Sequence, residues 1–216
     1  MKRLISVCVG LPREVSWKGK RVTTGIFKQP VNERVMLRSL NLEGDQQADL
    51  TVHGGAEKAV YAYSMEHYAY WRQQLPDEDF PWGAFGENLT IEELLETEVN
   101  IGDRFRIGTA EVMVTQPRFP CFKLNLKFGR DDMVKRFLNS RLSGIYFSVV
   151  QEGEVGVGDA IELVSRDENN VTVADIVQIY VREADDNLVR RAVKVPALAG
   201  SLRTYFLSQI EPERSL

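Results

Sequence analysis

Histidine and cysteine are scarce in this chain of 216 residues, which contains two of each. The two cysteines, Cys8 and Cys121, are too few for the disulfide framework of a small secreted protein. Together with His53 and His67 they also lack the spacing of a structural zinc site. The composition therefore favours a reducing, cytoplasmic setting.

Long apolar runs and an excess of positive charge are also absent. No stretch approaches the roughly 18 apolar residues of a transmembrane helix, so no membrane association is expected. The apolar run 4–11 is broken by Gly10, followed by Pro12 and without a small-residue cleavage site, so it predicts a buried strand and not a signal peptide. The formal net charge is −4. Binding of a nucleic-acid polymer is disfavoured, because neutralising phosphates requires clustered positive charge.

Common catalytic signatures are missing as well. The sequence contains no G-x-S-x-G, no H-E-x-x-H, no Walker phosphate loop and no strand-linked G-x-G-x-x-G. It therefore shows no nicotinamide or flavin domain of its own. Any redox activity would need electrons from an external donor.

Short apolar or alternating segments, separated by Gly, Pro and Asn, fill most of residues 1–164. The clearest is a hairpin over 103–116, where apolar residues alternate on both sides of a turn at Gly108. Two helices are inserted, with Ser64 and Asp131 as their predicted N-caps. This pattern predicts a mainly β domain, a β-barrel or closed, bent sheet with inserted helices.

Residues 165–216 have a different character. A polar linker is followed by three short helical segments, which begin at Thr172, at Asp185 or Asp186, and at Pro196. Such a unit is too small to fold alone. We expect a C-terminal three-helix bundle that packs on the β domain.

The segment TQPRFPCFKLN is the most informative for chemistry. Cys121 follows the end of a predicted strand, and the bases Arg118 and Lys123 lie close to it in sequence. A loop position gives access, and nearby cations favour the thiolate that ligates metals. A small buried cysteine in a turn is the alternative. Cys8 lies inside an apolar strand, which indicates a structural role.

Three other segments carry candidate binding residues. In LEGDQQADLTVHGG, the pair Gly54 and Gly55 permits backbone N–H groups to converge on a phosphate, and His53 can donate to the same anion. Asn88 in FGENL and Lys28 in TTGIFK add polar and basic groups. Each segment taken alone is equally typical of an ordinary turn or a solvated charge.

Taken together, these segments resemble the YiiM-like group of MOSC domain proteins. The pattern extends through TGIFK, LEGDQQADLTVHGG, HYAYW, FGENLT, IGDRFRIG and TQPRFPCFKLN, and into a tail that resembles the three-helix appendage of this group. The resemblance implies a β-barrel that binds the molybdenum cofactor (Moco), with Cys121 as the protein's sulfur ligand to the metal. By matching segment, the implied cofactor-binding residues are Lys28, His53, Gly54, Gly55, Asn88, Arg118 and Lys123.

The implied activity is reduction of small N-hydroxylated compounds, such as 6-hydroxylaminopurine and related base analogues, in detoxification. Electrons would come from an external flavoprotein reductase. Cys121 and His53 are the predicted catalytic residues, His53 as a proton donor, whereas His67 has the sequence context of a structural residue. Three aromatic residues either line the substrate pocket or form a buried cluster: Tyr61, Tyr63 and Trp71.

Two other functions remain open from the sequence. The protein could be a non-catalytic carrier of Moco, or of sulfur as a persulfide on Cys121. The second of these is a thiol hydrolase, with Cys121 as nucleophile and His53 as base. If the cofactor is lost on purification, the site is expected to be empty or to hold phosphate in place of the pterin phosphate.

Overall fold

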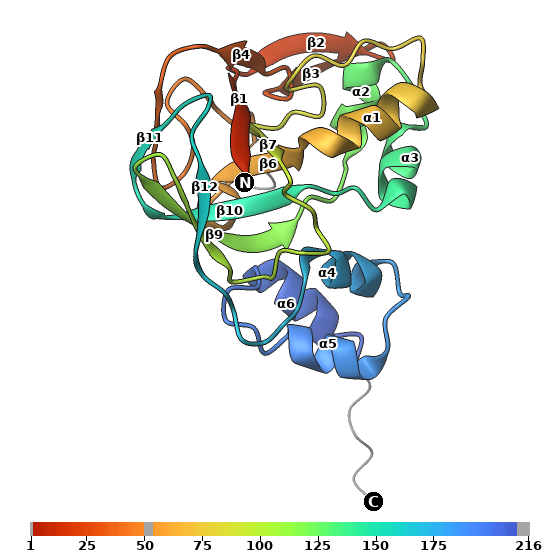
Figure 1. The fold of residues 1–216 in the computed structure, drawn as a ribbon. Coiled ribbons are helices and arrows are strands. Elements are labelled where there is room, and N and C mark those ends of the chain that lie inside the picture. The colour runs from red at the N-terminus through yellow and green to blue at the C-terminus, as the bar shows by residue number, and fades with distance from the viewer. Residues whose placement is uncertain (1, 50–53, 211–216) are drawn as a thin grey trace, which may run out of the picture.

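The computed structural model describes residues 2–49 and 54–210 (Figure 1). Its strands are β1 (Arg3–Val9), β2 (Arg13–Trp17), β3 (Lys20–Thr24), β4 (Gln29–Val31), β5 (Val35–Leu37), β6 (Val60–Ser64), β7 (Leu89–Glu92), β8 (Arg104–Ile107), β9 (Ala110–Pro117), β10 (Ile145–Gln151), β11 (Gly153–Val155) and β12 (Ile161–Ser165). Its helices are the short 3-10 helix η1 (Ala56–Lys58) and the α-helices α1 (Met65–Gln74), α2 (Phe122–Phe128), α3 (Met133–Ser140), α4 (Val173–Tyr180), α5 (Asp186–Ala192) and α6 (Gly200–Leu207). The predicted class, mainly β with helices, is confirmed.

Most strands belong to one sheet with the order β12-β8-β9-β10-β6-β7-β1-β4. Neighbouring strands are antiparallel except β6 and β7, which are parallel. The predicted hairpin over 103–116 is confirmed, with Ile107 of β8 opposite Ala110 of β9. Leu4, Val7 and Cys8 of β1 are fully buried, because both faces of this strand are covered. That burial accounts for its continuous apolar sequence.

The sheet bends so that the start of its edge strand β12 comes into contact with β1, the strand next to the other edge. The backbone N–H of Leu4 donates to the carbonyl of Asp159 at 2.9 Å, and that of Ile161 donates to Lys2 at 3.0 Å. The start of β12 therefore lies along β1. A strongly bent sheet with inserted helices is observed, and a fully closed barrel stays a prediction. Smaller two-stranded sheets are formed by β2 with β3 and by β5 with β11.

The helices form two groups (Figure 1). α1, α2 and α3 gather on one side of the sheet, where Tyr63, Trp71, Phe85 and Phe137 form a buried aromatic cluster. α4, α5 and α6 form the predicted C-terminal group, which lies below β9. Its boundary with the β domain, predicted between residues 164 and 165, stays a prediction.

Two helix starts differ from the prediction. α3 begins after Asp132 and not after Asp131. The Asp131 carboxylate pairs instead with Lys18 in the β2–β3 turn, at 2.5 Å. α6 begins at Gly200, not Pro196, because the Arg203 guanidinium donates to carbonyls of the preceding turn, including that of Pro196 at 3.0 Å.

Six elements were not expected from the sequence: β2, β4, η1, β6, α2 and β11. β11 is three residues long, too short for an alternating pattern to be read. α2 has no acidic residue in its first turn, and Cys121 at its N-cap makes no side-chain capping hydrogen bond. The usual signals of a helix start are therefore missing there.

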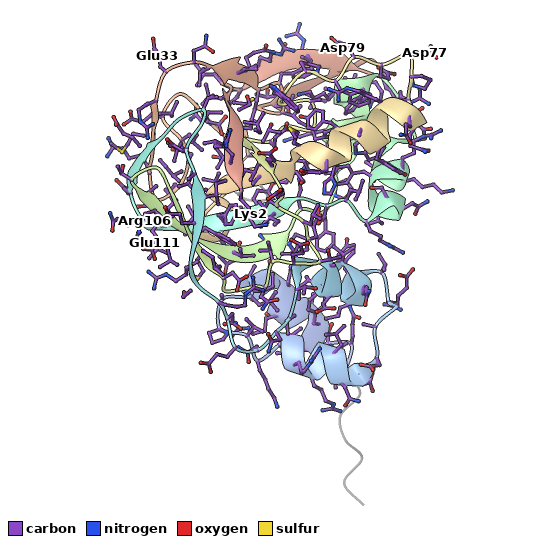
Figure 2. All side chains as sticks on the ribbon, viewed as in Figure 1. Lys2, Glu33, Asp77, Asp79, Arg106 and Glu111 are labelled. Carbon is purple, nitrogen blue, oxygen red and sulfur yellow. The ribbon has the colours of Figure 1, made fainter. Side chains whose placement is uncertain are left out.

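Acidic side chains are spread around the outside of the molecule. Glu33, Asp77 and Asp79 are exposed and lie at its periphery in Figure 2. In the described part of the chain, no helix is long and apolar enough to cross a membrane.

Candidate functional site

A pocket with about 690 Å³ of empty space, including part of its open mouth, lies where the predicted site segments meet. The residues around it come from the β3–β4 loop, from positions 46–48, from both sides of η1, from β6 and β10, from the turn before β7 and from the loop that follows β9. Most of the predicted site residues line it: Lys28, Gly54, Asn88, Arg118, Cys121 and Lys123. Residues far apart in sequence are thus brought together at one place.

Two predicted residues are not found in this lining. Gly55 is exposed and stands at the N-cap of η1, where its carbonyl accepts the N–H of Lys58 at 2.9 Å. Gly54 and Gly55 both have positive φ, 98° and 85°, a conformation that requires little strain only in glycine. His53 lies outside the described residues.

Cys121 is half-buried at the junction between the loop after β9 and α2. Its backbone is extended, with φ −123° and ψ 172°, and its carbonyl accepts the N–H of Leu124 at 2.9 Å. No disulfide involves it. Cys121 is therefore held in the pocket lining at the start of α2.

Arg118 lies beneath the pocket with only 8% of its surface exposed. Its guanidinium carbon is 4.9 Å from the ring centroid of Tyr61 and 5.4 Å from that of Phe137, so it is held by cation–π contacts. Burial disfavours its charge, but the nearby tyrosine oxygens outweigh this effect and raise the pKa of Arg118 above its ordinary value. Its buried Nη1 finds no hydrogen-bond partner among the described residues. A buried cation with an unsatisfied donor is what an anionic ligand would complete.

Lys28 and Asn88 form a polar network at the pocket floor with Asp45. The Lys28 ammonium and the Asp45 carboxylate form a buried ion pair, and Asn88 Nδ2 donates to Asp45 Oδ2 at 2.9 Å. Burial lowers the pKa of Lys28, and Asp45 opposes that change. The Asn88 amide also donates to the Cys8 carbonyl at 3.2 Å and accepts the N–H of Tyr61 at 3.2 Å.

The comparisons with known proteins agree with this arrangement. The model of the MOSC domain matches residues 49–162, and that of the "YiiM-like, 3-alpha helix domain" matches residues 171–211. YflK of Bacillus subtilis is 41% identical over 207 residues, which cover 95% of this chain and 93% of that protein. YiiM of Escherichia coli is 40% identical over 82% of this chain and 80% of its own length. The chain belongs to the MOSC domain family.

Two further relatives extend this result. A protein of Gibberella moniliformis named "Reductase" is 32% identical over 82% of this chain, which matches 32% of that protein. The crystal structure of YiiM from Geobacillus stearothermophilus superposes with a TM-score of 0.82 at 33% identity, covering 98% of this chain and all of that one. MOSC domains are associated with binding of the molybdenum cofactor.

Several residues that line or support the pocket of this MOSC domain were not predicted from the sequence, and the clearest is Asp45, which contacts the lining residues Lys28 and Asn88. It is 5% exposed, and its Oδ1 also accepts the N–H of Gly10 at 2.9 Å. The only signal was an acidic residue in the glycine-containing loop LEGD. Nothing local indicates that it neutralises Lys28, seventeen positions away.

Glu87 and Lys127 form hydrogen bonds with the backbone of the loops that surround the pocket. Glu87 is fully buried, and its carboxylate accepts the backbone N–H groups of Gly83 at 2.7 Å and Phe85 at 3.0 Å. Lys127 Nζ donates to the carbonyls of Ile26, at 3.0 Å, and Gly83. Burial lowers the pKa of Lys127 to about 8. These contacts fix the loops before β4 and before β7 relative to α2.

Gly25 marks a close approach between two pocket loops. A Cβ atom built at this position would be 2.4 Å from the carbonyl oxygen of Gln46. Any side chain there would force the two loops apart, which explains a glycine in TTGIFK more directly than flexibility does.

Of the remaining polar and aromatic candidates, one lines the pocket and the others are buried away from it. His67 is not in the pocket lining; it is buried, with Nε2 2.8 Å from Glu96 Oε2, which supports the predicted structural role. Of the three aromatic candidates, Tyr61 lines the pocket. Tyr63 and Trp71 belong to the buried cluster, where Trp71 Nε1 donates to the Tyr63 hydroxyl at 2.7 Å.

Proposed function

We propose that this protein is a Moco-dependent reductase of N-hydroxylated compounds, of the type of 6-hydroxylaminopurine, supplied with electrons by an external flavoprotein reductase. One observation carries the proposal. The half-buried Cys121 shares a pocket with the buried Arg118, whose Nη1 has no partner among the described residues. This combination suits a ligand that is both thiophilic and anionic.

The side chains of the pocket fit Moco in chemical type. Molybdenum accepts soft sulfur ligands, and Cys121 is the thiol at the pocket wall. The pterin phosphate is a dianion, for which Arg118 and Lys123 are the best-placed cations. Lys123 has no hydrogen bond or ion pair with any residue that the structure describes. Lys28 suits this role less well, because Asp45 already neutralises it.

The reaction is balanced as follows. The N–O bond of the substrate R–NHOH breaks, two electrons and two protons are consumed, and the products are R–NH₂ and water. When bound, Moco supplies the two-electron chemistry at its metal. The protein's own task is to orient the substrate and to keep the site dry.

Aromatic side chains provide this orientation. Tyr61, Tyr146 and Phe119 all line the pocket and present surfaces on which a planar base can stack. Burial raises the pKa of Tyr61 and of Tyr146, so both phenols keep their protons. Of the two histidines that the sequence offers as proton donor, His53 lies outside the described residues, and His67 does not line the pocket. The relative named "Reductase", which matches 82% of this chain, supports a reductive role.

The test is elemental analysis of molybdenum in protein produced in a Moco-competent host. We expect near-stoichiometric molybdenum in the wild type, its loss in Cys121→Ser with an unchanged melting temperature, and its retention in Cys8→Ser. The wild type, reduced chemically, should then convert 6-hydroxylaminopurine to the aminopurine, as measured by chromatography.

Two outcomes would contradict the proposal. Molybdenum that persists in a folded Cys121→Ser variant would show that the ligand is wrongly assigned. A wild-type protein without molybdenum, from a host whose cofactor pathway is verified, would exclude the reductase. Cyanide-releasable sulfur on Cys121 would then favour the persulfide carrier. A protein that holds molybdenum without turnover, and transfers it, would be a Moco carrier.

A further inference from the structure

An aromatic contact joins the C-terminal helices to the wall of the pocket. Phe119 lines the pocket, two residues before Cys121. Its ring lies face to face with the ring of Tyr180, the last residue of α4, with centroids 3.6 Å apart and an angle of 19° between the planes. One face of Phe119 is therefore covered by the C-terminal unit.

The two partners of this contact differ in rigidity. Tyr180 belongs to a helix whose first turn is fixed by a capping box between Thr172 and Asp175. Ile176 and Ile179 of the same helix are buried in the main core. Phe119, in contrast, lies in the loop between β9 and α2, outside regular structure. A rigid helix thus supports a loop residue.

A second contact joins the same unit to η1, another segment beside the pocket. The N–H of Gly200, at the start of α6, donates to Glu57 Oε1 at 2.9 Å. The Glu57 carbonyl accepts the hydroxyl of Thr115 in β9 at 2.6 Å. Glu57 belongs to η1, which follows the pocket residue Gly54. The helical unit therefore contacts two segments that line the same pocket as the cysteine.

We propose that Tyr180 is a positioning residue for the functional site. Its ring fixes Phe119, and through it the loop that sets the exposure of the Cys121 thiol. The C-terminal unit is on this account part of the site and not merely an appendage. The inference rests on Cys121 as the functional residue, but it can be tested without any cofactor.

The experiment measures alkylation of the cofactor-free protein by iodoacetamide, with each cysteine followed by mass spectrometry. Tyr180→Leu keeps an apolar side chain and removes the flat ring. We expect Cys121 to react about fivefold faster in this variant, which corresponds to about 1 kcal/mol in the balance between held and released loop. Tyr180→Phe keeps the stacked ring and should react at the wild-type rate.

Two controls separate positioning from general destabilisation. Cys8 is fully buried, so it reports unfolding and should stay unmodified in every variant. Tyr70→Leu removes a tyrosine on α1 that is 37% exposed and has one edge contact with Trp71. This variant should leave the Cys121 rate unchanged.

A wild-type rate for Cys121 in a folded Tyr180→Leu variant would overturn the proposal. If Tyr180→Leu also exposes Cys8, Phe119→Leu becomes decisive, because it removes the same contact from the loop side. An unchanged alkylation rate of Cys121 in Phe119→Leu would also refute the proposal. When both single variants fold, the double variant should react no faster than either, since they remove one shared contact. Absence of molybdenum would refute the proposed function and leave this result standing.

Discussion

At the scale of single residues, the most informative feature is the contrast between the pocket's two buried cations. Lys28 is paired with Asp45, whereas Arg118 rests on aromatic rings and keeps a donor without a partner among the described residues. A buried charge without a counter-ion is costly unless a ligand completes it. The structure thus ranks two residues that look equivalent in sequence, and it favours Arg118 as the group that meets an anion.

The two cysteines also differ in a way that pH can reveal. Cys8 is buried in β1, and burial raises its pKa from 9.0 to about 12. In the unfolded chain the thiol loses its proton from about pH 9, while the folded protein retains it. The folded state then binds more protons, so the contribution of Cys8 to stability falls as pH rises between about 9 and about 12.

This predicts a pH-dependent difference between the wild type and Cys8→Ala. The free energy of unfolding of the wild type, relative to the variant, should decrease above pH 9 by up to about 1.4 kcal/mol per pH unit. Urea unfolding at neutral and alkaline pH measures it, and comparison with the variant cancels other titrating groups. A difference that stays constant from neutral pH to about pH 10 would show that Cys8 ionises normally in the folded protein.

The sequence could identify site residues that share a motif, but not those that act across the fold. Arg118, Cys121 and Lys123 lie within six consecutive positions, so their proximity was visible. The Asp45 carboxylate and the Tyr180 ring come from distant segments and contact the pocket residues Lys28 and Phe119. No local pattern records such contacts, because they depend on how the loops and helices pack.

At the scale of elements, predictability followed the strength of local signals. The β8–β9 hairpin was found because its alternation and turn agree, and α4 because Thr172 precedes an apolar helical pattern. α2 was missed because its N-cap is a cysteine that directly follows a proline-containing turn. The start of α6 was misplaced because the side chain of Arg203 fixes the preceding turn from a distance.

The capping box of α4 gives a prediction at this scale. Thr172 Oγ1 accepts the N–H of Asp175 at 3.0 Å, and Asp175 Oδ2 accepts the N–H of Thr172 at 2.9 Å. Thr172→Ala should reduce the free energy of unfolding by about 1 kcal/mol, because a helix N–H loses its acceptor. Thr172→Ser keeps the acceptor and should recover most of that loss. Urea denaturation of the three proteins provides the measurement.

Equal stability of Thr172→Ala and the wild type would mean that water replaces the cap without cost. Since α4 ends at Tyr180, the same variant also bears on the site. Fraying at the first turn should leave the Phe119–Tyr180 contact intact, as long as the buried Ile176 and Ile179 hold the helix.

At the scale of the whole molecule, the β domain and the C-terminal helices share one core. Phe105 and Val112 of the sheet belong to the same buried cluster as Ile176 and Phe206 of the helices. Neither part can unfold without exposing apolar surface of the other. The two family matches, at 49–162 and 171–211, therefore describe segments that depend on a common interior.

The last prediction follows from this shared core: the chain should unfold in one cooperative transition. Calorimetric and van't Hoff enthalpies should agree, and near- and far-ultraviolet circular dichroism should give the same midpoint. A separate low-temperature transition confined to helical signal would show that the C-terminal unit melts alone. It would then release Phe119 before the sheet unfolds, and Cys121 would become more reactive while Cys8 stayed protected. A common core requires that any rise in the reactivity of Cys121 coincides with the exposure of Cys8.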